Sequence, residues 1–169
     1  MGKATAGGIA TALTASEVFA DEKAESSINK PKNVLFLWGG WEGHDPGPCK
    51  DIFVPWLKQS GFDVVVSDTL DSYIDKELMN SLDFIVQIWT MGEISGEQSK
   101  GLIGAVKKGV GLAGWHGGLG DSFRTNTEYQ FIVGGQWVSH PGGVIDYEVN
   151  IIDHEDPITS SIKDFKMHS

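Results

Sequence analysis

The sequence GVGLAGWHGG, residues 109–118, is the stretch that decides the fold. It opens with small apolar residues, as in a buried strand, and closes with Gly-x-His-x-Gly. Glycines two residues either side of a central residue have the spacing of a nucleophile elbow, a sharp turn between a strand and a helix. We therefore predict a strand that ends near Trp115 and a strained, exposed His116 beside a helix N-terminus. The alternative is a glycine-rich turn that only happens to contain a histidine.

Strand and helix patterns alternate on both sides of this stretch. The expected strands cover residues 33–38, 62–67, 83–89 and 109–115, and the expected helices cover 48–60, 76–81, 95–108 and 124–133. Residues 144–153 alternate and predict a fifth strand, antiparallel or at an edge. Residues 164–169 suggest no closing element, so we expect a domain truncated at its C-terminus. The alternation predicts an open, doubly wound, mostly parallel α/β sheet.

Composition narrows the classes of function. The 169 residues carry a formal net charge of −10, which argues against nucleic acid as a partner. No apolar run reaches the roughly 20 residues needed to cross a bilayer, so we expect no transmembrane segment. Cys49 is the single cysteine, which excludes disulfides within the chain and zinc sites built from several thiolates.

The first residues read as a leader rather than as part of the fold. Residues 1–20 are rich in small residues and resemble an export signal, and residues 21–32 read as a polar linker. We therefore expect an exported or periplasmic protein with its domain over residues 33–169. The alternatives are a disordered alanine-rich leader and a cytoplasmic protein.

Ligands of open α/β sheets bind beyond the carboxyl ends of the strands. The expected strands end at three segments that carry polar and aromatic side chains: residues 39–45, 90–93 and 114–118. A parallel sheet brings such segments to one rim, so we expect His44 and His116 to lie close together. His140 follows a glycine-rich segment that could return to the same rim. A dinucleotide site is disfavoured, because residues 39–43 lack the Gly-x-Gly-x-x-Gly spacing.

Four motifs together resemble the ThuA-like (trehalose utilisation) family. They are GGWEGHD at 39–45, GWHGG at 114–118, GGQWVSHP at 134–141 and DPIT at 156–159, and the resemblance extends from Asn33 to Phe165. The resemblance implies a bacterial protein of carbohydrate metabolism with the flavodoxin-like fold of class I glutamine amidotransferases. In those enzymes the elbow carries a cysteine, so His116 would occupy its place and glutaminase activity would be excluded. Cys49 falls at the start of the first helix, where packing is its expected role.

The histidines then suggest acid–base chemistry on a sugar hydroxyl or carbonyl, since imidazoles titrate near neutrality. The expected catalytic residues are His116, His44, His140 and Asp45, and the expected substrate-binding residues are Trp41, Glu93, Trp115 and Arg124. We expect Arg124 to begin the helix after the elbow and Asp121 to cap it. His154 and His168 are expected to be solvated.

Several interpretations stay open at this point. The same histidines could serve packing, and the indoles could fill the core. A divalent metal held by the three histidines with Asp45 or Glu93 is an option, although no close His-x-x-x-His pair supports it, and no cofactor is certain. The chain is then an enzyme acting on trehalose, another disaccharide or an oxidised sugar, or a non-catalytic sugar-binding module. A degenerate copy with a structural role and a homo-oligomer are further alternatives.

Overall fold

The computed structural model describes residues 32–169. The predicted leader (1–20) and almost all of the predicted linker (21–32) lie outside the described residues. The chain divides into two compact units, one that runs to Gln136 and one from Trp137 to Ser169, and each is described by itself.

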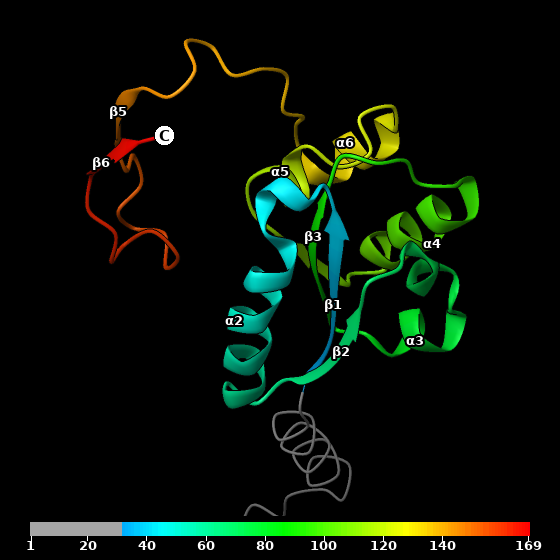
Figure 1. The fold of residues 1–169 in the computed structure, drawn as a ribbon. Coiled ribbons are helices and arrows are strands. Elements are labelled where there is room, and N and C mark those ends of the chain that lie inside the picture. Colours follow the sequence, from blue (N-terminus) through cyan, green and yellow to red (C-terminus); the bar gives the residue numbers. More distant parts are fainter. Residues whose placement is uncertain (1–31) are drawn as a thin grey trace, which may run out of the picture. The chain divides into compact units, whose positions relative to one another are not determined.

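The first unit is built on a parallel sheet of four strands in the order β2-β1-β3-β4. Figure 1 shows β1 between β2 and β3. These strands are β1 (Asn33–Gly40), β2 (Asp63–Ser67), β3 (Phe84–Thr90) and β4 (Gly111–Ala113). All three pairings are parallel, which confirms the predicted α/β class. β4 is shorter than predicted because Gly109 and Val110 still bond to the last turn of the preceding helix.

Helices fill the connections between the strands. They are η1 (Glu42–His44), α2 (Pro46–Gln59), η2 (Leu70–Ile74), α3 (Lys76–Ser81), α4 (Gly96–Lys107), α5 (Gly117–Gly120) and α6 (Thr127–Val133). The capping box of Ser95 and Gln98 begins α4 as its sequence indicates. Within residues 32–169, no helix combines the length and the apolar character that a membrane span requires.

The segment after the elbow differs from the prediction. The expected helix over 124–133 begins only at Thr127, with Asn126 as its cap, so Arg124 does not start a helix. Asp121 does not cap it either: its buried carboxylate accepts two hydrogen bonds from Arg124, at 2.5 and 2.9 Å. The ion pair forms because Asp121 stands three residues before Arg124 at the end of α5.

Each face of the sheet carries its own apolar cluster. On one face Leu57 of α2 packs with buried residues of β1 and β3: Val34, Phe36, Val86 and Ile88. On the other face the helices η2, α3, α4 and α6 cover a second cluster, whose members include Leu35, Leu37, Ile85, Leu102 and Tyr129. The central strands β1 and β3 therefore bury both faces, as their continuous apolar runs predict.

A buried polar network joins β3 to the helices of the second face. Gln87 accepts a hydrogen bond from the hydroxyl of Tyr73 at 2.6 Å, and its amide donates to Tyr129 Oη at 2.6 Å and to Ser122 Oγ at 3.1 Å. Burial raises the pKa of Tyr73 well above its usual range and raises the pKa of Tyr129 to about 12. The network fixes η2, α6 and the end of the elbow segment to the centre of the sheet.

The second unit contains a two-stranded antiparallel sheet, β5 (Asp146–Val149) with β6 (Phe165–His168). β5 confirms an antiparallel strand within 144–153, although it belongs to this separate sheet. The prediction that residues 164–169 form no element is wrong. β6 is recognisable only through its distant partner, since four residues carry too little periodicity of their own. His154 and His168 are exposed, and His168 Nδ1 lies 2.7 Å from Asp146 Oδ1.

Candidate functional site at the rim of the sheet

The loops after β1 and β3 are joined directly at the carboxyl rim. The backbone N–H of Trp41 donates to the carbonyl of Thr90 at 3.1 Å. Thr90 also holds the imidazole of His44, because its Oγ1 lies 2.8 Å from His44 Nδ1. The hydrogen bond fixes the orientation of a ring that lies on the short helix η1.

The structure brings His44 and His116 together. Their ring centroids lie 4.7 Å apart with an interplanar angle of 67°, an edge-to-face contact. The indole of Trp41 also contacts His44, with its ring centroid 4.8 Å from that of His44. The ring of His44 thus contacts two other rings at the rim, and Trp41 is half exposed.

The elbow itself has the strained geometry that its glycines indicate. His116 has φ 51° and ψ −140°, conformations that residues with a Cβ rarely adopt, and it is exposed at the start of α5. The flanking glycines allow α5 to approach β3. A Cβ on Gly114 would overlap the carbonyl oxygen of Gln87, and one on Gly118 would lie 2.8 Å from Cα of Ile88.

Gly117 is required for a different reason, the position of His44. A Cβ at Gly117 would overlap Cε1 of the His44 ring and would lie 2.8 Å from Nδ1. The imidazole therefore rests against the bare backbone of the elbow. The same motif that exposes His116 also provides the surface on which His44 lies.

Backbone strain is concentrated at this rim. Among residues 32–169, the non-glycine residues with positive φ are Asp45, Met91, His116 and Phe123. Asp45 follows η1, Met91 follows β3, and the other two flank α5. Such conformations cost about 1–3 kcal/mol each and persist where the surrounding structure enforces them, often at functional sites.

A small cavity opens between the two histidines and helix α2. Its volume is about 80 Å³, and its lining is His44, Pro46, Cys49, Ile88, Thr90, Trp115, His116 and Gly118. Since pockets that enclose a whole ligand have volumes of about 300–1,000 Å³, this cavity admits one functional group of a ligand rather than a whole sugar. The remainder of any such ligand would lie outside it, over the rim.

Two of the lining residues that were not predicted for the site, Thr90 and Cys49, carry a hydroxyl and a thiol. The segment 90–93 was predicted to reach the rim, but with Glu93 rather than Thr90 as its functional residue. Cys49 was expected only to pack at the start of the first helix. Since α2 starts at the same rim, Cys49 also lines the cavity. Cys49 also packs against the apolar cluster below α2, as expected.

Five of the residues predicted for the site do not line this cavity: Trp41, Asp45, Glu93, Arg124 and His140. Asp45 is exposed, and its backbone carbonyl accepts from Cys49 N at 3.0 Å in the first turn of α2. Glu93 is exposed in the loop before α4. Arg124 is held by Asp121, and that hydrogen bond raises the pKa of its guanidinium.

The predicted tryptophans and the third histidine take separate places. Trp115 lines the cavity and also packs on Phe53, with ring centroids 4.4 Å apart. Its indole therefore contributes both to the cavity lining and to packing against α2. His140 belongs to the second unit, where its ring lies 4.6 Å from that of Trp137. Over residues 32–169, no three His, Cys, Asp or Glu side chains are grouped closely enough to hold a metal ion.

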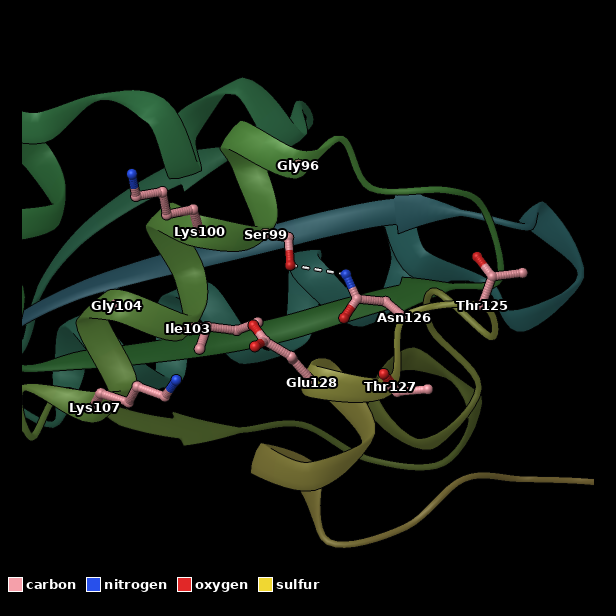
Figure 2. A pocket seen from close by; sticks show the side chains of 10 residues that line it. All are labelled: Gly96, Ser99, Lys100, Ile103, Gly104, Lys107, Thr125, Asn126, Thr127 and Glu128. Carbon is pink, nitrogen blue, oxygen red and sulfur yellow. Dashed lines mark hydrogen bonds between the residues drawn. The ribbon is translucent and has the colours of Figure 1, made fainter.

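A larger groove lies away from the histidines, between α4 and the start of α6 (Figure 2). Its volume is about 510 Å³, and its lining includes Ser99, whose hydroxyl accepts a hydrogen bond from Asn126 Nδ2 at 2.8 Å. Lys100 and Lys107 stand along one wall and Glu128 along the other. The groove has the volume of a ligand site but lacks strained backbone and imidazoles. We therefore assign the candidate site to the rim.

A parallel sheet with a strained histidine at a strand-to-helix elbow defines an open α/β protein of the flavodoxin-like type. The chain belongs to the ThuA family, described as trehalose utilisation, whose family model matches residues 33–169. Neither the curated proteins nor the solved structures include a match to this chain. The family resemblance predicted from the four motifs is confirmed.

Proposed function

We propose that this protein binds a disaccharide of the trehalose type, or its oxidised derivative, at the rim and performs acid–base chemistry on one of its groups. The observation that carries the proposal is the contact between His44 and His116 at a cavity that both rings line, together with Thr90, whose hydroxyl is bonded to His44. Imidazoles change charge near neutral pH, so one ring can accept a proton while its neighbour donates one.

The residues around the pair support a division of roles. Thr90 and Gly117 fix the His44 ring, whereas His116 is exposed and meets the ligand from the elbow. We assign the accepting role to the oriented His44 and the donating role to His116, on a hydroxyl or carbonyl seated in the cavity. A glutaminase reaction has no support, because the elbow presents an imidazole where that chemistry needs a thiolate.

The aromatic rim suits a sugar. Trp41 is 50% exposed, and its indole contacts the ring of His44, which lines the cavity. An exposed indole offers an apolar face with a polar N–H, which matches a sugar ring with its apolar C–H face and its hydroxyls. The cavity would take one group of the sugar while Trp41 covers the rest.

Calorimetric titration and turnover assays with trehalose and its keto derivative test the proposal. The intact protein is expected to bind at least one of these sugars and to convert it. His116→Ala is expected to lower turnover by about 100-fold or more, the range of general acid–base catalysis, with binding retained. His154→Ala, at an exposed histidine of the second unit, is the matched control.

Three results separate the alternatives. Binding without turnover by the intact protein would support a sugar-binding module instead of an enzyme. Absence of binding to either sugar would contradict the proposal that the ligand is a disaccharide. Equal losses in His116→Ala and His154→Ala would show that the rim histidines have no special role.

Export is a separate part of the proposal, based on the leader-like residues 1–20. Cell fractionation with N-terminal sequencing should find a chain cleaved near residue 20 outside the cytoplasm. A full-length chain retained in the cytoplasm would contradict export.

A further inference from the structure

The outer edge of β2 is an unprotected sheet edge. Within the described residues β2 pairs on one side only, with β1. Its sequence, DVVVS, places three valines in succession, and Val65 and Val66 are 44% and 39% exposed. Native sheets often protect such edges with short strands, charged residues, proline or a bulge, because free backbone groups there recruit further strands. β2 is short, but it has no proline and no bulge, and its one charged residue is the first, Asp63.

The direction of the free backbone groups follows from one hydrogen bond. Asp63 N donates to the carbonyl of Lys32 at 2.9 Å, on the side of β1. Residues of a strand alternate in the direction of their N–H and C=O groups, so Val65 and Ser67 also face β1. The N–H and C=O of Val64 and Val66 therefore face outward.

The outward N–H and C=O groups of one β2 strand can pair with the same groups of a second β2 strand. We infer that β2 is the dimer interface, where a second copy of the chain adds its own β2 antiparallel about a two-fold axis at Val65. Val64 of one copy then lies opposite Val66 of the other, and each such pair exchanges two hydrogen bonds. The Val65 side chains of the two copies meet on the axis.

The negative charge of Asp63 is compatible with this register. Asp63 of one copy lies opposite Ser67 of the other, so the two carboxylates are kept at opposite ends of the paired strands. The pairing joins the two sheets into one continuous sheet, with four strands from each copy. It uses no residue that lines the cavity at the rim.

The opposite edge of the sheet is a poorer candidate. β4 has three residues and begins with Gly111, so it offers fewer outward groups than the five residues of β2. Because five-residue strands bury less surface than the roughly 1,200–2,000 Å² of standard interfaces, we expect a weak, concentration-dependent dimer. A two-fold dimer is also the commonest homo-oligomer.

Sedimentation of the full chain over a range of concentrations tests the inference. Val65→Lys and Val65→Glu each place two like charges face to face on the axis, so each variant alone should weaken dimerisation by about 10-fold or more. An equimolar mixture of the two variants should dimerise again as a one-to-one pair, because opposite charges then meet. Val138→Lys, at an exposed valine of the second unit, should leave dimerisation unchanged.

Val66→Pro is the second variant, since it removes an outward N–H without removing a hydrogen bond to β1. Its dimerisation should weaken while its circular dichroism spectrum stays that of the parent. A parent chain that stays monomeric throughout the concentration range would overturn the inference. So would a dimer that survives Val65→Lys, or a mixture of the two charged variants that stays monomeric.

Discussion

The buried Gln87 network makes a prediction about folding stability. In Gln87→Leu the amide is replaced by an apolar side chain of similar size, and the fully buried Tyr73 hydroxyl loses its acceptor. An orphaned buried donor costs about 1–3 kcal/mol. Tyr129 keeps a bond to the carbonyl of Leu119 and Ser122 keeps one to Trp89, so each of them loses only one bond.

The expected loss in the free energy of unfolding is about 2–4 kcal/mol, from one orphaned donor and two weakened bonds. Adding Tyr73→Phe to Gln87→Leu removes the orphaned hydroxyl, so the double variant should recover about 1–3 kcal/mol. In the parent background the same Tyr73→Phe should destabilise. The sign of its effect therefore reverses with the residue at position 87.

Urea unfolding followed by circular dichroism measures these differences as shifts in the midpoint. Gln59→Leu, at an exposed glutamine at the end of α2, is the matched control and should change stability by no more than about 0.5 kcal/mol. The reasoning is refuted if Tyr73→Phe destabilises both backgrounds equally. It is also refuted if Gln87→Leu is as stable as the control.

Three further predictions concern the rim and the response to pH. Gly117→Ala should push the His44 ring away by roughly 1 Å and lower turnover by about 100-fold, with unfolding measured alongside to show that the fold is kept. Thr90→Val should release the same ring, and NMR signals of His44 that stay unchanged in this variant would contradict the assigned hydrogen bond. Stability should fall as pH rises from about 10 to about 12, because the raised pKa of Tyr129 favours its neutral form in the folded state. Unfolding midpoints at these pH values should fall less steeply in Tyr129→Phe.

Much of the fold could be predicted because its signals are local. Apolar runs, the capping box at Ser95 and the glycines around His116 each act within a few residues. The contact of His44 with His116 also followed from the sequence, because a parallel sheet brings its carboxyl ends to one rim. The topology of a parallel sheet therefore predicts a contact between residues that are distant in the sequence, which local patterns alone do not.

The misses depend on contacts that no local pattern encodes. Thr90 looks like any strand-end threonine until the ring of His44 lies against it. Asp121 has the residue type of a helix cap, but its burial favours the ion pair with Arg124. β6 forms because residues nearly twenty positions earlier supply its partner. In each case a tertiary contact overrides the local preference.

The unusual backbone of His116 has a consequence for attempts to engineer a more robust protein. Glycine is the residue that its φ and ψ suit best, so His116→Gly should yield a chain that tolerates more heat and denaturant. That gain would come from deleting an imidazole on which the proposed chemistry relies. Selection for stability alone would therefore tend to remove the proposed activity. Screens of variants of this protein should measure stability and activity together.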